Sequence, residues 1–116
     1  MFEHPLEERC YQFAKRVRSF CRGLRKDVIN IEDIKQLARS SASIGANYIE
    51  ANEALSKKDF VMRIKISRKE AKESMFWLKL ISTENDSTFE KERLRLLQEA
   101  KELTNIFGSI YRKSEN

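Results

Sequence analysis

The chain has 116 residues, of which 41% are hydrophobic and 35% charged, and a formal net charge of +5 at pH 7. Two domains would each be too small to bury a sizeable core, so a single domain is expected over residues 1–116. One Pro and three Gly favour long helices over a turn-rich β protein. The composition therefore predicts an all-α domain.

Neither a membrane span nor an export signal is visible in the sequence. The longest stretch without a charged residue runs from residue 40 to residue 49, about half of the roughly 20 residues that a span needs. The N-terminus lacks the basic start and apolar run of a secretory signal, so a cytoplasmic location is expected. Cys10 and Cys21 lie about 16 Å apart along a helix, too far to pair, and are interpreted as small buried apolar residues.

The first two predicted helices span about residues 5–26 and 31–54. The first starts at Pro5 and carries apolar residues at alternating spacings of four and three, from Leu6 to Leu24. Asn30 is expected to be the N-cap of the second. Gly45, inside the second helix, is interpreted as a point of close helix approach, because a helical Gly is unfavourable unless packing offsets it.

The third predicted helix, about residues 57–82, opens with a capping-box pattern at Ser56. Its seam recurs at strict spacings of four and three, at Phe60, Ile64, Ser67, Ala71, Ser74, Leu78 and Ile81. A second apolar stripe lies roughly opposite and indicates an oligomer interface formed by Met62, Ile66, Trp77 and Leu80.

The fourth predicted helix spans about residues 88–111, after a capping box that begins at Ser87, and a polar tail follows it. Its seam includes Leu96, Leu103 and Phe107. Short connections between the four helices favour an antiparallel up-down-up-down bundle.

The positive charge is concentrated in two of these helices. Residues 1–26 carry a net charge of +4 and residues 56–80 a net charge of +5, whereas residues 27–55 carry −3 and residues 81–116 carry −1. Helices one and three would lie on a diagonal of the bundle, so two basic ridges are expected. The candidate phosphate-backbone contacts are Lys15, Arg18, Arg22, Arg25, Lys58, Lys65, Arg68 and Lys72.

Two classes of function compete for this chain. Basic ridges favour a nucleic-acid-binding accessory protein, and structured RNA or duplex DNA fits better than single strands, because most aromatics occupy seam positions. The alternative is a protein–protein interaction scaffold whose charge serves solubility alone. Steep weakening of binding with salt would distinguish phosphate contacts from apolar docking.

Residues 36–51 (QLARSSASIGANYIEA) and 56–60 (SKKDF) resemble the 23S rRNA intervening-sequence protein family, also called four-helix-bundle protein. The family pattern also has paired acids in the following helix, matched here by Glu70 and Glu73. Ala51 and Asp59 depart from the usual Gly and Glu. The departure at Ala51 affects the expected connection at residues 52–55 more than the fold.

The resemblance implies a homo-oligomeric ring, a pentamer, and extends to the accessory proteins of diversity-generating retroelements, which hold a reverse transcriptase and nucleic acid. A reverse transcriptase or another protein is thus an implied partner. The marked residues Arg39, Glu50, Glu70 and Glu73 are interpreted mainly as a structural ion-pair network, because an Arg buried between helices needs carboxylate partners. The competing interpretation is a partner-binding site. Ser40, Ser43 and Asn47 are candidate acceptors for the remaining Arg39 donors.

Catalysis is not expected. Glu70 and Glu73 share a helix face, and paired carboxylates are the catalytic groups of some hydrolases. However, the sequence has no Gly-rich phosphate loop and no Glu-x-x-His pattern, and its single histidine is the near-terminal His4. Neither a metal nor another cofactor is predicted.

Overall fold

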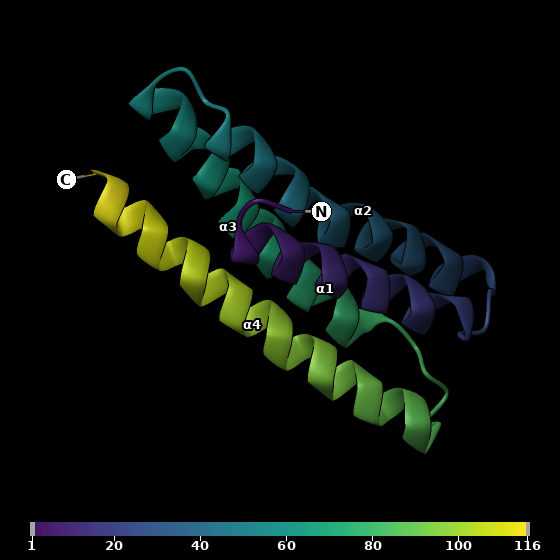
Figure 1. Cartoon of the computed structure of the whole chain (residues 1–116). Helices are drawn as coiled ribbons and strands as arrows, with labels where there is room; N and C mark the ends of the chain where they lie inside the picture. The colour runs from purple at the N-terminus through teal and green to yellow at the C-terminus, as the bar shows by residue number, and fades with distance from the viewer. Residues whose placement is uncertain (1, 116) are drawn as a thin grey trace.

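Four antiparallel helices make up the fold (Figure 1), and the computed structural model describes residues 2–115. The helices are α1 (Pro5–Arg22), α2 (Val28–Asn52), α3 (Lys57–Leu80) and α4 (Ser87–Glu115). Both α1 and α3 pack against α2 and α4, which leaves α1 and α3 on one diagonal and α2 and α4 on the other. The predicted all-α four-helix bundle is confirmed.

The turn between α1 and α2 differs from the prediction at both ends. α1 ends at Arg22, four residues earlier than expected, and the Lys26 ammonium donates to the carbonyl oxygens of Cys21, Arg22 and Leu24. α2 starts at Val28 because the Asp27 carboxylate accepts from the backbone amide of Asn30 at 2.8 Å.

Asn30 is therefore not the N-cap of α2, and its side chain has another structural role. It is almost fully buried, with 3% of its surface exposed. Its amide nitrogen donates to the carbonyl oxygens of Arg25 and Ser82, and its Oδ1 accepts from the Ser82 backbone amide. Asn30 thus joins the α1–α2 turn to the α3–α4 connection. This contact could not be inferred from the sequence pattern around Asn30.

Both ends of α3 and the start of α4 lie close to their predicted positions, whereas the end of α4 lies further along the chain than predicted. Ser56 caps α3 as expected, accepting from the Asp59 amide, and the helix ends at Leu80 rather than near residue 82. The cap of α4 is Asp86 and not Ser87, because Asp86 accepts from the amides of Thr88 and Phe89. α4 continues past residue 111 to Glu115, with Arg112 and Lys113 in a last turn where cations are favourable.

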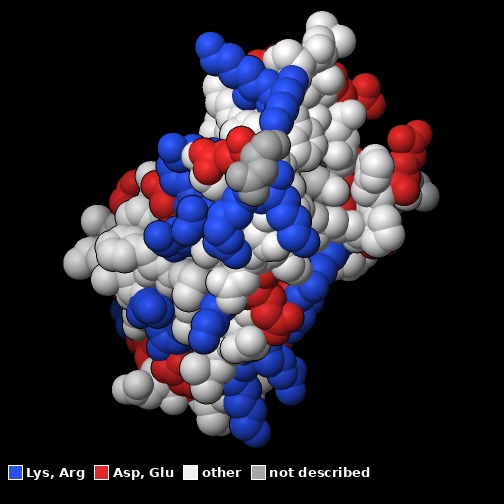
Figure 2. All heavy atoms as spheres, turned by 90° about the vertical axis from the view of Figure 1, so that its left-hand side faces the viewer, with Lys and Arg blue, Asp and Glu red and all other residues white. Residues whose placement is uncertain are grey.

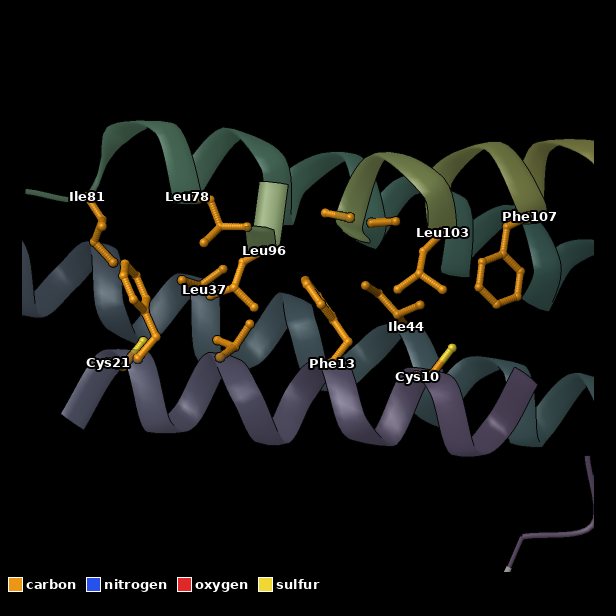
Figure 3. Packing of buried hydrophobic residues seen from close by; sticks show 14 of the residues in the cluster. Cys10, Phe13, Cys21, Leu37, Ile44, Leu78, Ile81, Leu96, Leu103 and Phe107 are labelled. Atoms are coloured by element: carbon orange, nitrogen blue, oxygen red, sulfur yellow. The ribbon is translucent and has the colours of Figure 1, made fainter. Parts of the chain in front are cut away.

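The apolar seams meet in one core that runs along the bundle (Figure 3). Phe13 from α1, Ile44 from α2 and Leu103 from α4 are at most 2% exposed. The predicted seam of α3 is buried except for Phe60, which lies half-buried near the start of the helix. Cys10 and Cys21 are free and buried, as predicted, and burial raises the pKa of their thiols to about 12 and about 11.

Gly45 lies where α2 approaches α1, as expected for a small residue at a helix contact. A Cβ atom placed on Gly45 would lie 2.9 Å from the Cβ atom of Cys10, closer than two carbon atoms can approach without a shift. The glycine therefore sets the distance between α1 and α2.

Candidate nucleic-acid interface

The α1 ridge is partly neutralised by acids from α4 and the α3–α4 connection. Arg16 pairs with Glu92 at 2.7 Å, and Arg25, a predicted phosphate contact, pairs with Glu84 at 3.1 Å. Arg9, outside the predicted set, pairs with two α4 carboxylates, Glu99 and Glu102. Because these cations already have anionic partners, they contribute less to a surface for phosphate groups.

The other predicted cations of α1 make only weak contacts with the chain. The Lys15 ammonium lies 5.8 Å from the centroid of the Tyr11 ring, and Arg18 Nη1 donates to the Ala14 carbonyl oxygen at 3.4 Å. Arg22 is exposed in the last turn. These three side chains stay on α1 and do not reach the ridge of α3, which lies diagonally opposite.

The α3 ridge keeps its positive charge. The predicted phosphate contacts of this ridge are Lys58, Lys65, Arg68 and Lys72. Within the described residues, none of them forms an ion pair. The end of α4, which was predicted to be a polar tail, adds the exposed residues Arg112 and Lys113. Figure 2 shows the face where α3 begins and α4 ends, over which Lys and Arg side chains gather with a few acids among them.

A groove between α3 and α4 extends this basic surface toward the far end of α3. Lys72 and Lys79 from α3 and Lys101 from α4 line it, together with Met75 and the exposed ring of Phe76. Lys79 and Lys101 were not among the predicted contacts, because the packing of α4 on α3 is what brings them together. From residue 58 to residue 79 the α3 axis extends about 32 Å, close to one turn of a nucleic-acid duplex.

Arg39 of α2 covers a buried carboxylate on α3. Its Nη1 lies 2.8 Å from Glu70 Oε2 and its Nη2 lies 3.5 Å from Glu73 Oε2. The Arg39 side chain is 50% exposed whereas that of Glu70 is 7% exposed, so the buried member is the acid and not the expected arginine. Glu50 is exposed about three helical turns from Arg39 and lies outside this network in the described structure.

The two carboxylates next to Arg39 influence each other. Burial by itself would raise the pKa of Glu70, but a hydrogen bond with Glu73 and the Arg39 guanidinium bring that pKa below its ordinary value. The hydrogen bond with Glu70, together with burial, raises the pKa of Glu73. As the pH falls, Glu73 therefore takes up a proton before Glu70 does.

Replacing Arg39 with Ala is expected to lower the free energy of unfolding by about 1–2 kcal/mol at neutral pH, because Glu70 stays buried without its cation. The cost is below that of a fully buried pair, since water screens the half-exposed arginine. Ionised Glu70, with its lowered pKa, contributes stability above its unfolded-state pKa, and this contribution is lost as the pH falls through the folded-state pKa. The deficit of the variant should therefore shrink in acid.

Urea unfolding of Arg39→Ala between pH 3 and pH 7 measures this dependence. Lys35→Ala is the matched control, since Lys35 pairs with Glu32 at 3.6 Å on the exposed side of the same helix and should change stability little. We expect Arg39→Ala to affect folding or assembly before nucleic-acid binding. A stable, assembled variant that had lost binding would instead place Arg39 in a binding site.

Other polar side chains of the α2 motif bond across the α2–α3 seam and not to Arg39. Ser40 Oγ lies 2.9 Å from Ser74 Oγ. Asn47 Oδ1 accepts from Arg63 Nη1 at 2.9 Å, and its amide donates to the Ser43 carbonyl oxygen within α2, so Ser40 and Asn47 do not make the expected link to Arg39. Close packing of small residues explains why hydroxyl groups are buried here with their hydrogen bonds satisfied.

The predicted interface residues differ in exposure. Met62 is 48% and Leu80 is 54% exposed, whereas Ile66 and Trp77 are half-buried and Trp77 packs against the core. Leu80 shares a shallow groove with Val28 and Ile29, which are 83% and 76% exposed. Neither of these two residues was predicted as an interface residue, because the second helix was expected to begin only at about residue 31.

The described residues show neither a metal-binding cluster nor a membrane-spanning helix. No three His, Cys, Asp or Glu side chains in the described part of the chain are grouped so that they could hold a metal ion. Among the helices of residues 2–115, none is both long and apolar enough to cross a membrane. His4 is exposed, and its ring centroid lies 6.4 Å from that of Tyr48.

The fold and surface define a small four-helix bundle with a basic α3–α4 face. The family model of the 23S rRNA-intervening sequence protein matches residues 6–109, and the chain belongs to this family. A similar crystal structure is that of a protein of unknown function from the S23 ribosomal protein family of Bacteroides thetaiotaomicron VPI-5482. It has a TM-score of 0.74 and 28% sequence identity, and the alignment covers 90% of this chain and 96% of that one. No curated protein matches the chain in sequence.

Proposed function

We propose that this protein is a non-enzymatic, cytoplasmic accessory protein that binds the phosphate backbone of structured RNA or duplex DNA. The supporting observation is that Lys58, Lys65, Arg68 and Lys72 of α3 have no anionic partner among the described residues, whereas acids neutralise part of the α1 ridge at Arg16 and Arg25. Phosphate contacts of this kind hold a duplex without reading its sequence. The α3–α4 face is therefore the main binding surface, and α1 has a secondary role.

The distribution of aromatic rings favours a folded or duplex ligand over a single strand. Single-strand binding relies on a series of exposed rings on which successive bases stack. Phe13 and Phe107 are in the core, and on the α3–α4 groove Phe76 is the ring with a large exposed area. A groove lined by lysines with one exposed ring therefore suits the phosphate backbone of a duplex better than the stacked bases of a single strand.

Assembly into a homo-oligomeric ring is a further part of this proposal, with five subunits as the family resemblance implies. Met62 and Leu80 provide exposed apolar surface on α3, and Ile66 and Trp77 lie half-buried on the same helix. Apolar side chains of this size are stabilised when a second subunit removes them from water. A ring would repeat the basic face around its circumference, which increases the number of phosphate contacts per particle.

Binding to a structured ribosomal-type RNA and to duplex DNA across a salt series tests the function. The wild type is compared with a variant in which Arg18, Arg22, Lys65 and Lys72 are changed to Glu. We expect wild-type binding to weaken steeply with salt, because bound phosphates release counterions, and the assembled variant not to bind. Absence of wild-type binding at low salt would reject the nucleic-acid function.

The second candidate is a scaffold that docks another protein, such as a reverse transcriptase, through apolar contacts. The exposed side chains of Val28, Ile29 and Leu80 in their shared groove favour it. Such binding should change little between low and moderate salt. It should also survive the charge variant and be lost when Ile29 is changed to Asp, the opposite pattern to that expected for phosphate binding.

A further inference from the structure

The groove between α3 and α4 combines positive charge with an exposed aromatic ring. Its volume is about 380 Å³, within the range of roughly 300–1,000 Å³ that is typical of ligand sites. No Asp or Glu is among the residues that line it in the described structure. A ligand in this groove therefore meets positive charge that no acid of the groove offsets.

The three lysines of the groove are available to a ligand. Lys72 and Lys79 lie two turns apart on the same side of α3, about 10 Å along the helix axis, and Lys101 lines the groove from α4. All three are exposed, and none of their ammonium groups has a partner within the described part of the chain. A second copy of this face would bring like charges together, which is unfavourable, so an anionic ligand fits better.

Apolar groups lie between these lysines. The half-buried side chains of Met75 and Thr104 form the floor of the groove, with Thr104 Oγ1 3.8 Å from Met75 Sδ. The Phe76 ring is 57% exposed. Its centroid lies 5.0 Å from that of Trp77, with the two ring planes at 82°, so an edge-to-face contact holds the ring while much of its surface stays free.

Asn105 adds a hydrogen-bonding group to the α4 wall of the groove. It is exposed, and its side chain makes no hydrogen bond among the described residues. A side-chain amide has both donors and an acceptor, and the edges of nucleobases present complementary groups. A nucleotide is the ligand class that combines anionic phosphate with a flat ring whose edge carries donors and acceptors.

We propose that this groove binds one unpaired nucleotide of a structured RNA, with its base stacked on Phe76 and hydrogen-bonded to Asn105. The phosphates on either side of the base contact the three lysines. This inference rests on the proposed function, and it names the RNA feature that is recognised beside the duplex. Proteins read RNA in this way at bulges and loops, where a base is free to leave the helix. A longer single strand would need several rings, whereas Phe76 is the one ring that lines this groove in the described residues.

Two RNA hairpins that differ only by a single-nucleotide bulge in the stem test the inference. We expect the wild type to bind the bulged hairpin about ten-fold more tightly, as for one base stacked on an aromatic side chain. Phe76→Leu should remove this preference and leave the affinity for the fully paired hairpin unchanged, and Phe76→Tyr should retain the preference. Tyr11→Leu is the matched control, because it removes a 40% exposed ring from α1.

The preference for the bulged hairpin should survive in Tyr11→Leu. If the wild type bound both hairpins equally, the nucleotide site would be overturned and the proposed function would stand. Survival of the preference in Phe76→Leu would also overturn the site.

The role of the lysines is tested by the double variant Lys79→Gln and Lys101→Gln. It should reduce the log–log salt slope for the bulged hairpin by about 2, because each phosphate contact releases about one counterion. The matched control is Lys91→Gln with Arg95→Gln, which removes two exposed cations of α4 that do not line the groove. Equal salt slopes for the two double variants would contradict the phosphate contacts.

Titration with adenosine 5′-monophosphate separates a free nucleotide from a nucleotide of RNA. Trp77, the single tryptophan of the chain, reports on binding because its ring lies against Phe76. A saturable fluorescence change that is absent in Phe76→Leu supports the groove, and no change up to millimolar concentrations contradicts it. The same change with inorganic phosphate would overturn the role of the base.

The two kinds of experiment together locate a failure. If the monophosphate binds but the bulged hairpin is not preferred, the groove is a site for a free nucleotide and the RNA assignment is wrong. If the wild type binds neither hairpin, the proposed function fails, and the titration still decides whether the groove binds a nucleotide.

Discussion

Changing Lys58, Lys65, Arg68 and Lys72 of α3 to Glu should reduce binding to structured RNA by at least about 100-fold at moderate salt, because four phosphate contacts are replaced by repulsion. The same change at Lys15, Arg18 and Arg22 of α1 and at Arg25 of the α1–α2 turn should have a smaller effect. The cause of the difference is local. Arg25 already has an acidic partner in Glu84, and Glu92 places another acid on the same ridge at Arg16, whereas the four α3 side chains form no ion pair among the described residues.

The two variants are matched in the number of charges reversed and in net charge, so a difference between them cannot come from overall repulsion. Glu is as good a helix former as Lys or Arg, and at Lys58, in the first turn of α3, it is favoured by the helix dipole. Circular dichroism and the size of the assembly should be measured first, and then binding by fluorescence anisotropy. Equal loss in both variants would indicate a surface that spans both diagonal helices, and a larger loss in the α1 variant would contradict the assignment to α3.

Gly45→Ala should destabilise the fold by about 1–3 kcal/mol, although alanine favours helix formation elsewhere. The new Cβ would lie 2.9 Å from the Cβ atom of Cys10, which is attached directly to the α1 backbone and cannot rotate away. The helices must separate to relieve this contact, and α1 would then lose part of its packing on α2. Urea unfolding monitored by circular dichroism measures the change.

Gly108→Ala is the matched control, because it introduces the same methyl group into another helical glycine of the chain. Its nearest neighbours would be the ends of the Arg112 and Arg68 side chains at 3.3 and 3.5 Å, which can move. This variant should be unchanged or more stable by up to about 1 kcal/mol. Equal destabilisation of the two variants would show that helix separation at Gly45 is not the cause.

The local pattern of the sequence was sufficient for much of the fold. Apolar spacings of four and three identify the buried side of a helix whatever it packs against, so the core positions from Phe13 to Phe107 were predictable. The cap at Ser56 was predictable for the same reason, since a cap bonds to an amide only three residues away. Helix ends that depend on other segments were not, and Asn30 is the clearest example because its partner Ser82 lies 52 residues away.

The candidate site shows the same division between local and long-range information. Charge counts along the chain identified α1 and α3 as basic, and the family resemblance marked Arg39 and Glu70, whose side chains lie 2.8 Å apart. They could not show that an acid of α4 neutralises Arg16 on α1, or that Lys101 of α4 lines the same groove as Lys72 of α3. Periodicity and charge are properties of one helix, so the fold class and the basic helices could be predicted from the sequence. Which cations have acidic partners depends on how helices distant in sequence pack together, and that became visible in the three-dimensional structure.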